Sequence, residues 1–242
     1  MQTLKDRFAV ITGASSGIGR AIALGLAAQG VKLCLVGRKL ETLKEVAVIA
    51  QKTTSTVVCY LVDLTVDEDI INLTANLKQD CGQVDLLVLS AGSYSMGTLQ
   101  NSSIQDLDFL YRANVRAPYL LTQSLLPMLL SSQGQIVFIN SSAIMRTRAN
   151  VGQFAATQHS LKAIADSLRE EVNPHQVRVL SVYPGRTATP RQAMIHEMEG
   201  KPYHPERFMQ PEDVASVVIN ALSLPRSAEV TDIHLRPFAK PM

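Results

Sequence analysis

The sequence predicts a doubly wound α/β fold, in which helices cover both faces of a parallel sheet of about seven strands. Short apolar runs alternate with longer amphipathic stretches along the chain, as in repeated strand–helix–strand units with right-handed crossovers. A glycine-rich stretch follows the first apolar run and opens the first amphipathic stretch. The 242 residues are 46% hydrophobic, which suits one domain with a buried core, and we expect residues 1–242 to form it.

The strands are predicted from runs of nearly continuous apolar residues, which are typical of strands covered on both faces. The seventh run is the weakest of them. The predicted strands are 8–12, 33–37, 57–62, 86–90, 135–140, 177–183 and 230–235.

The stretches between the strands have the periodicity of amphipathic helices. Pro127 is expected to bend or interrupt the fourth and longest stretch, and "PEDVASVVINAL" opens with a proline and acids that favour a helix N-terminus. The segment 184–210 contains four prolines and is predicted to be irregular. It follows a strand's carboxyl end, where doubly wound folds bind ligands. The predicted helices are 17–30, 39–52, 66–80, 103–130, 152–172 and 211–223.

Composition and charge exclude several classes of protein. A net charge of +2 is too small to indicate nucleic-acid binding. Cys34, Cys59 and Cys81 fit no metal-binding or CxxC spacing, so we expect no metal site and interpret them as buried small hydrophobic residues in a reducing compartment. The sequence shows neither a signal peptide nor an apolar run of membrane-spanning length. We therefore expect a soluble cytoplasmic protein without a membrane partner.

The stretch "TGASSGIG" at residues 12–19 predicts a phosphate-binding turn of the Rossmann type. Gly13, Gly17 and Gly19 allow the backbone to turn tightly and to approach a pyrophosphate, while the following helix offers free N–H groups and a partial positive charge. The position between a strand and a helix makes this signal specific. Further cofactor contacts are expected from Ser15, Ser16 and Ile18.

The end of the second predicted strand indicates which dinucleotide binds. An acidic residue there would bond the ribose 2′-hydroxyl and repel a 2′-phosphate. This chain instead has Gly37, Arg38 and Lys39, and the Arg38 guanidinium can make a forked contact with phosphate. The sequence therefore predicts NADP(H) rather than NAD(H) as the cofactor.

Over nearly its whole length the chain resembles the short-chain dehydrogenases/reductases. The matching motifs occur in the family's order: "TGASSGIG", "DLT" (63–65), "SAG" (90–92), "NV" (114–115), "NSS" (140–142) and "PGRTAT" (184–189). The resemblance implies hydride transfer between a nicotinamide and a carbonyl or alcohol. It also implies cofactor contacts from Asp63, Leu64, Ala91, Gly92, Gln158, Pro184, Gly185, Thr187 and Thr189.

The family's catalytic residues match this chain only in part. The resemblance assigns Ser141 to carbonyl polarisation and Asn114 to a water relay. The family's proton-donating Tyr is replaced by Phe154, and its Lys four residues later by Gln158. Phe154 cannot transfer a proton, and losing a general acid typically costs ~10²–10⁴ in rate. Gln158 keeps an amide that can bond ribose hydroxyls but cannot lower the pKa of a phenol.

Three explanations of these replacements stay open at the level of sequence. The protein could be a degenerate member that binds NADP(H) in regulation or assembly, or an engineered inactive variant. It could also be an enzyme with another acid. Tyr94 follows "SAG" and borders the expected cleft, whereas His196 is expected to be a solvated helix residue. The candidate acids are Ser141, Tyr94, Tyr183, Tyr203 and His196.

The sequence also gives expectations about substrate and assembly. The segment 186–210, with Arg191, His196 and Tyr203, is expected to shape the pocket for a small-molecule substrate that the sequence does not name. The stretch "LDFLYRANVRAPYLLTQSLLPMLL" has more apolar residues than one buried helix face requires. In the family, helices near 103–130 and 152–172 usually form a four-helix interface between subunits. We therefore predict a homodimer or homotetramer.

Overall fold

A seven-stranded parallel sheet forms the centre of the computed structural model, which describes residues 3–238. The strands follow the order β3-β2-β1-β4-β5-β6-β7. The chain therefore places β2 and β3 on one side of β1 and the later strands on the other, so the topological switch point lies between β1 and β4. The strands are β1 (Phe8–Thr12), β2 (Lys32–Gly37), β3 (Val57–Leu61), β4 (Leu86–Leu89), β5 (Gln135–Ile139), β6 (Arg178–Pro184) and β7 (Asp232–Leu235).

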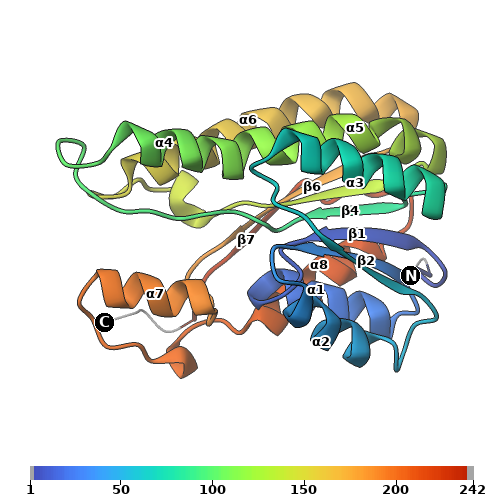
Figure 1. Cartoon of the computed structure of the whole chain (residues 1–242), viewed down its shortest axis with the longest axis horizontal. Coiled ribbons are helices and arrows are strands. Elements are labelled where there is room, and N and C mark those ends of the chain that lie inside the picture. Colours follow the sequence, from blue (N-terminus) through green and yellow to red (C-terminus); the bar gives the residue numbers. More distant parts are fainter. Residues whose placement is uncertain (1–2, 239–242) are drawn as a thin grey trace.

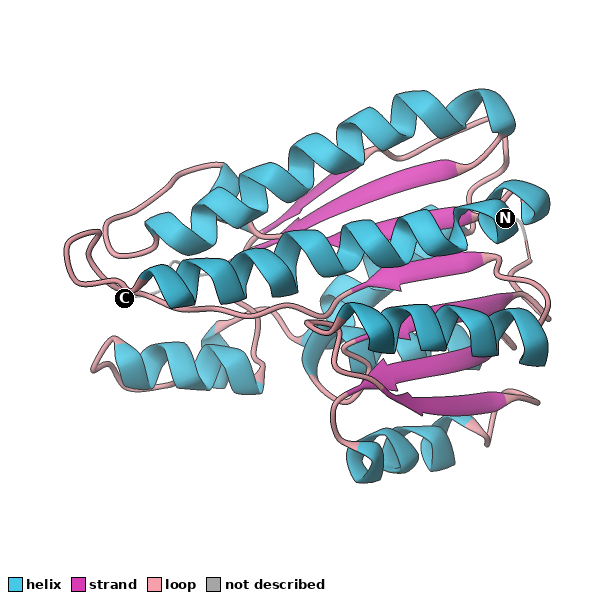
Figure 2. Ribbon diagram, turned by 45° about the horizontal axis from the view of Figure 1, so that its top comes forward, coloured by secondary structure: helices cyan, strands magenta, loops and turns pink. Residues whose placement is uncertain are grey.

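Helices cover both faces of this sheet, which confirms the predicted fold class. In Figure 1, α1, α2 and α8 lie on one side of the strands, and α3, α5 and α6 lie on the other. Figure 2 shows the strands side by side between these layers. The helices are α1 (Gly17–Ala28), α2 (Leu40–Ala50), α3 (Asp67–Asp80), α4 (Ile104–Tyr111), α5 (Ala117–Ser132), α6 (Gly152–Val172), α7 (Pro190–Met198) and α8 (Pro211–Leu222).

Two hydrophobic cores follow from the alternation of side chains along each strand. In β1, Ala9 and Ile11 join the core under α1, α2 and α8. Phe8 and Val10 point the other way and join the core under α3, α5 and α6. The central strands are therefore apolar at most positions, because both of their faces are covered. The edge strands β3 and β7 are only half-buried, which corrects the expectation of full burial for those two.

The longest predicted helix, 103–130, is divided into three parts. A π-helical turn, η1 (Arg112–Arg116), separates α4 from α5. Pro127 was expected to bend or interrupt this stretch, yet it lies inside the continuous α5. Pro127 and Gln123, whose carbonyl loses its partner, are both exposed, so water can bond that carbonyl.

The segment predicted to be irregular contains a helix of its own. Thr189 caps α7 by accepting a hydrogen bond from the Gln192 N–H, and Pro190 occupies the first helical position. Both features favour a helix start. Figure 1 shows α7 at one end of the molecule, apart from the helices that cover the sheet. The prediction of an irregular segment is therefore wrong for these residues.

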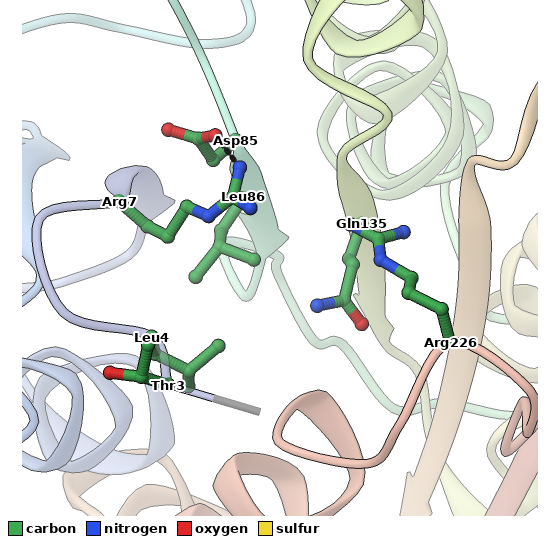
Figure 3. A pocket seen from close by; sticks show the side chains of 7 residues that line it. All are labelled: Thr3, Leu4, Arg7, Asp85, Leu86, Gln135 and Arg226. Atoms are coloured by element: carbon green, nitrogen blue, oxygen red, sulfur yellow. Dashed lines mark hydrogen bonds and ion pairs between the residues drawn. The ribbon is translucent and has the colours of Figure 1, made fainter. Parts of the chain in front are cut away.

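A partly buried ion pair lies at the amino-terminal edge of the sheet. Asp85 is 3% exposed, and its carboxylate accepts hydrogen bonds from Arg7 Nη1 at 2.6 Å and from the Phe8 N–H at 2.8 Å. Figure 3 shows this pair beside Gln135 and Arg226 in a small hollow. These side chains join the starts of β1, β4 and β5, so the hollow belongs to the scaffold.

Several structural features bear on the classes of protein that the sequence excludes. Within the described residues, no helix combines the length and apolar composition needed to span a bilayer. No cluster of three or more metal-binding side chains occurs between residues 3 and 238. All three cysteines are free thiols; Cys34 is buried as expected, whereas Cys59 and Cys81 are only partly buried.

Candidate functional site

The glycine-rich turn lies at the switch point, directly after β1. Gly13 has φ of +66°, and a Cβ there would lie 2.9 Å from the Ala91 nitrogen. A Cβ on Gly19 would lie 2.4 Å from the Gly13 carbonyl oxygen. Both positions therefore require glycine, one for its backbone conformation and both for the close approach of neighbouring backbone.

The Thr12 side chain joins this turn to the segment after β4. Its Oγ1 accepts hydrogen bonds from the Ser90 and Ala91 N–H groups at 3.0 and 3.1 Å. Ser90 stands where the family motif has a second asparagine. These hydrogen bonds hold the "SAG" segment against the glycine-rich turn, so two of the predicted cofactor motifs lie side by side.

The start of α1 faces the start of α7. No side chain caps α1 at Ser16, so the first N–H groups of that helix are free to bind an anion. A Cβ on Gly17 would lie 3.0 Å from Thr189 Cγ2. This contact places Thr189, predicted to bind the cofactor, beside the phosphate-binding turn.

The "PGRTAT" segment is ordered by its own hydrogen bonds. Pro184 ends β6, and the Gly185 N–H donates to the Leu235 carbonyl at 2.8 Å. Thr187 is buried, and its Oγ1 donates to the Gly185 carbonyl at 3.1 Å. The predicted nicotinamide-end residues are therefore held at the carboxyl end of β6.

Arg38 and Asp63 lie near each other at the carboxyl ends of β2 and β3. Gly37 and Leu61 pair at the ends of these strands, and Arg38 is exposed. Hydrogen bonds from the Thr65 N–H and hydroxyl lower the pKa of Asp63, and the Arg38 charge lowers it further. Arg38 forms none of the ion pairs found among residues 3–238, so its guanidinium can meet a 2′-phosphate.

Asn114 lies buried in the π-helical turn, where its amide makes several hydrogen bonds. Its Oδ1 accepts from the Ser93 N–H at 2.7 Å, and its Nδ2 donates to the Ser93 carbonyl and to Thr157 Oγ1, both at 3.0 Å. The bonds to Ser93 hold the segment after β4, and the bond to Thr157 holds α6. Asn114 therefore joins both sides of the site.

The first two turns of α6 contain the two replaced positions. Phe154 is 8% and Gln158 5% exposed. Gln158 Nε2 donates to Thr157 Oγ1 at 3.2 Å, and the Gln158 carbonyl accepts from Asn140 Nδ2 at 3.0 Å. Ser141 follows Asn140 at the end of β5, and its Oγ accepts a hydrogen bond from the Ala143 N–H. Of the four positions that the family resemblance assigns to catalysis, Asn114 and Ser141 keep polar side chains, whereas Phe154 and Gln158 cannot exchange protons.

Tyr94 is the candidate acid that touches the replaced phenol position. Its ring meets Phe154 edge-on, with 4.9 Å between centroids. Burial raises the pKa of Tyr94, and nearby Glu199 raises it further, against the opposing charges of Arg186 and Arg148. A raised pKa makes the phenol a weaker proton donor at neutral pH.

The other candidate acids are engaged elsewhere. Tyr183 is fully buried, donates to Asp232 at 3.0 Å and stacks on His234. His196, expected to be solvated, is instead 4% exposed. Gln192 and Arg186 occupy its two ring nitrogens, because α7 packs that face inward. Tyr203 stacks on Phe208 beside it.

Lys162, one helical turn beyond Gln158, does not replace the missing ammonium. Its Nζ donates to Asp166 at 2.5 Å, and this hydrogen bond raises the Lys162 pKa. The same ammonium lies 6.0 Å from the centroid of the Tyr183 ring. Lys162 therefore forms a partly exposed ion pair with Asp166 within α6.

Sequence reasoning missed several residues that organise the site. Thr12, Ser93 and Asn140 connect the predicted motifs through the hydrogen bonds described above. Thr12 and Asn140 could have been found, because each lies inside a quoted motif. Ser93 carries no local signal, since its partner Asn114 is 21 residues away.

The fold is that of the nicotinamide-dinucleotide oxidoreductases. A family model described as short chain dehydrogenase matches residues 7–200, and the chain belongs to that family. An uncharacterized oxidoreductase of Staphylococcus saprophyticus is 32% identical over 239 residues, covering 98% of this chain and 100% of that protein.

Two solved structures are similar over their whole length. A metagenomic short-chain oxidoreductase in complex with NADP has a TM-score of 0.85 and 28% identity, covering 99% of this chain and 100% of its own. An alcohol dehydrogenase from the archaeon Thermococcus sibiricus, complexed with 5-hydroxy-NADP, has a TM-score of 0.87 and 26% identity. That match covers 98% of this chain and 100% of the other. The ligands of both structures agree with the cofactor that the sequence predicts here.

Proposed function

We propose that this protein binds NADP(H) at the carboxyl edge of its sheet. The N–H groups at the start of α1 have no side-chain cap, and Gly13 and Gly19 pack closely against neighbouring backbone, so the turn fits a pyrophosphate. Arg38 is available for the 2′-phosphate, and Asp63 lies close by for the adenine end. Similar structures that hold NADP or 5-hydroxy-NADP support this assignment.

Hydride transfer between the cofactor and a carbonyl or alcohol is the chemistry of this site, and we propose that it is slow. The observation that carries this proposal is the burial of Phe154 and Gln158 beside Asn114 and Ser141. A phenyl ring has no proton to give. The Tyr94 phenol next to it has a raised pKa, and Lys162 is paired with Asp166.

Two measurements test the proposed function. Fluorescence titration should give saturable binding of NADPH, with weaker binding of NADH. NADPH oxidation at 340 nm, across a panel of aldehydes, ketones and quinones, should be slow for every compound. Brisk turnover that is lost on Tyr94→Phe or Ser141→Ala would instead identify an alternative acid and contradict the proposed impairment.

A second function, regulation or scaffolding by a non-catalytic nucleotide-binding protein, is favoured by Phe154 and Gln158, which leave no proton-donating pair at these positions.

Assembly is supported separately by the exposed apolar surface of α4 and α5. Ile104 is 61%, Tyr111 49% and Tyr119 50% exposed, which is unusual for large side chains gathered on neighbouring helices. A second copy packing against these helices and α6 would cover them. We therefore propose a homodimer or homotetramer.

The remaining assignments are proposals of the same kind. We propose that residues 1–242 act as one domain, in a reducing cytoplasmic compartment that suits three free thiols. The substrate is proposed to be a small molecule that enters beside α7.

A further inference from the structure

Arg191 extends from the first turn of α7 to the end of β4. Its Nη2 donates to the Gly92 carbonyl at 2.5 Å. A Cβ built on Gly92 would lie 3.9 Å from this Arg191 nitrogen and 3.0 Å from Asn114 Oδ1. The guanidinium is thus placed among residues that the family resemblance assigns to the cofactor and the reaction.

The surroundings of Arg191 place it beside the phosphate-binding turn. Gly13 packs against Ala91, the neighbour of Gly92, and Gly17 packs against Thr189, which begins the helix that carries Arg191. Residues adjacent to both members of the Arg191–Gly92 contact therefore pack against the turn that would hold a pyrophosphate.

The charge of Arg191 is not neutralised by a carboxylate. None of the ion pairs found among residues 3–238 includes it. Arg186, by contrast, makes two hydrogen bonds to the Glu199 carboxylate at 2.8 and 3.0 Å. Solvent reaches the Arg191 side chain, yet surrounding protein atoms desolvate it and lower its pKa. A carbonyl oxygen satisfies only one of its five N–H donors.

We propose that Arg191 is a ligand for the pyrophosphate of the bound dinucleotide, and that its guanidinium leaves the Gly92 carbonyl to take this role. The proposal rests on the proposed binding of NADP(H). A phosphate anion is a stronger partner for guanidinium than a neutral carbonyl, because both members are charged and two parallel bonds can form.

The test compares NADPH with adenosine 2′-monophosphate, which keeps the adenine and the 2′-phosphate but lacks the pyrophosphate. Dissociation constants are measured by fluorescence and calorimetry for the full chain and for Arg191→Met. The variant should bind NADPH about 10- to 100-fold more weakly and adenosine 2′-monophosphate with unchanged affinity. Arg191→Lys should recover part of the loss. Arg146→Met removes the same charge from another exposed side chain at this edge and should change neither constant.

Two results would overturn the inference while leaving NADP(H) binding intact. NADPH affinity that is unchanged or improved in Arg191→Met would mean that the Gly92 contact only obstructs the site. An equal loss for both ligands would mean that Arg191 supports the fold or the adenine end, and thermal melting would distinguish these. Failure of the unaltered protein to bind NADPH would overturn the proposed function together with this inference.

Discussion

Introducing the family's phenol and ammonium should raise the rate of carbonyl reduction, which we propose to be slow in the unaltered protein. The double variant Phe154→Tyr/Gln158→Lys puts both groups back on the first turns of α6, where the surrounding Asn114 and Ser141 are preserved. General acid catalysis contributes about 10²–10⁴ in rate, equivalent to about 2.7–5.5 kcal/mol of barrier. Each single variant should gain far less, because the two groups act as a unit.

The same change should lower the stability of the cofactor-free protein. Both positions are more than nine-tenths buried, so the new hydroxyl and the new ammonium lose their hydration when the chain folds. A combined penalty of about 3 kcal/mol lowers Tm by about 6–12 °C at this chain length. NADPH at about 100 times its Kd should offset about 2.7 kcal/mol of this loss, because it binds the folded state and not the unfolded chain.

The assay is NADPH oxidation at 340 nm for the unaltered, single and double variants, with cofactor affinity measured in parallel. Ser141→Ala in the double-variant background is the control and should remove the gained activity. A double variant that binds NADPH normally but turns over no faster across the whole panel would refute the reasoning, as would full activity in Phe154→Tyr alone.

Four further predictions follow from other parts of the molecule. Arg38→Asp should reverse the preference for NADPH over NADH, by about 10- to 100-fold in the ratio of dissociation constants; equal constants in the unaltered protein would refute the 2′-phosphate assignment. Gly13→Ala should lower stability by about 2 kcal/mol or more and abolish NADPH binding, because its Cβ would meet backbone at 2.9 Å. Gly82→Ala is the matched control in thermal melting, since Gly82 has the same φ of +66° with nothing within 4 Å. The lowered pKa of Asp63 stabilises the fold above the ordinary aspartate pKa of about 4, and this contribution is lost as the pH falls through the lower folded-state pKa. Asp63→Asn should therefore flatten acid-induced changes in Tm, and an unchanged profile would contradict this. Finally, sedimentation at micromolar concentration should give the mass of a dimer or tetramer, and a monomer would remove the proposed interface on α4, α5 and α6.

Local patterns were sufficient to predict the sheet and most helices. Continuous apolar runs located all seven strands to within two residues at either end, because burial on both faces leaves few other compositions. The π-helical turn at 112–116 was missed, since it depends on Asn114 bonding Ser93 across 21 residues. The helix α7 was missed because four prolines outweighed the capping signal of Thr189.

The sequence motifs of the candidate site could be predicted, but the side-chain contacts between these motifs could not. Gly13 and Arg38 were named from local sequence patterns, and Asn114 from the family resemblance. The contact between Arg191 and Gly92 joins residues 99 positions apart, and no periodicity or spacing encodes such a pair. The burial of His196 was likewise set by how α7 packs against Tyr203 and Phe208.

The ion pair of Arg7 and Asp85 has an evolutionary consequence. It joins the strands at the edge opposite to the candidate site, so this part of the fold does not depend on the side chains at positions 154 and 158. A phenyl ring at position 154 still packs against Tyr94, and removing a hydroxyl from a buried ring leaves its shape intact. Selection for a folded, nucleotide-binding chain alone therefore does not eliminate such a replacement. A lineage with this arrangement can lose its original reaction in one or two substitutions and keep a stable scaffold on which another role can develop.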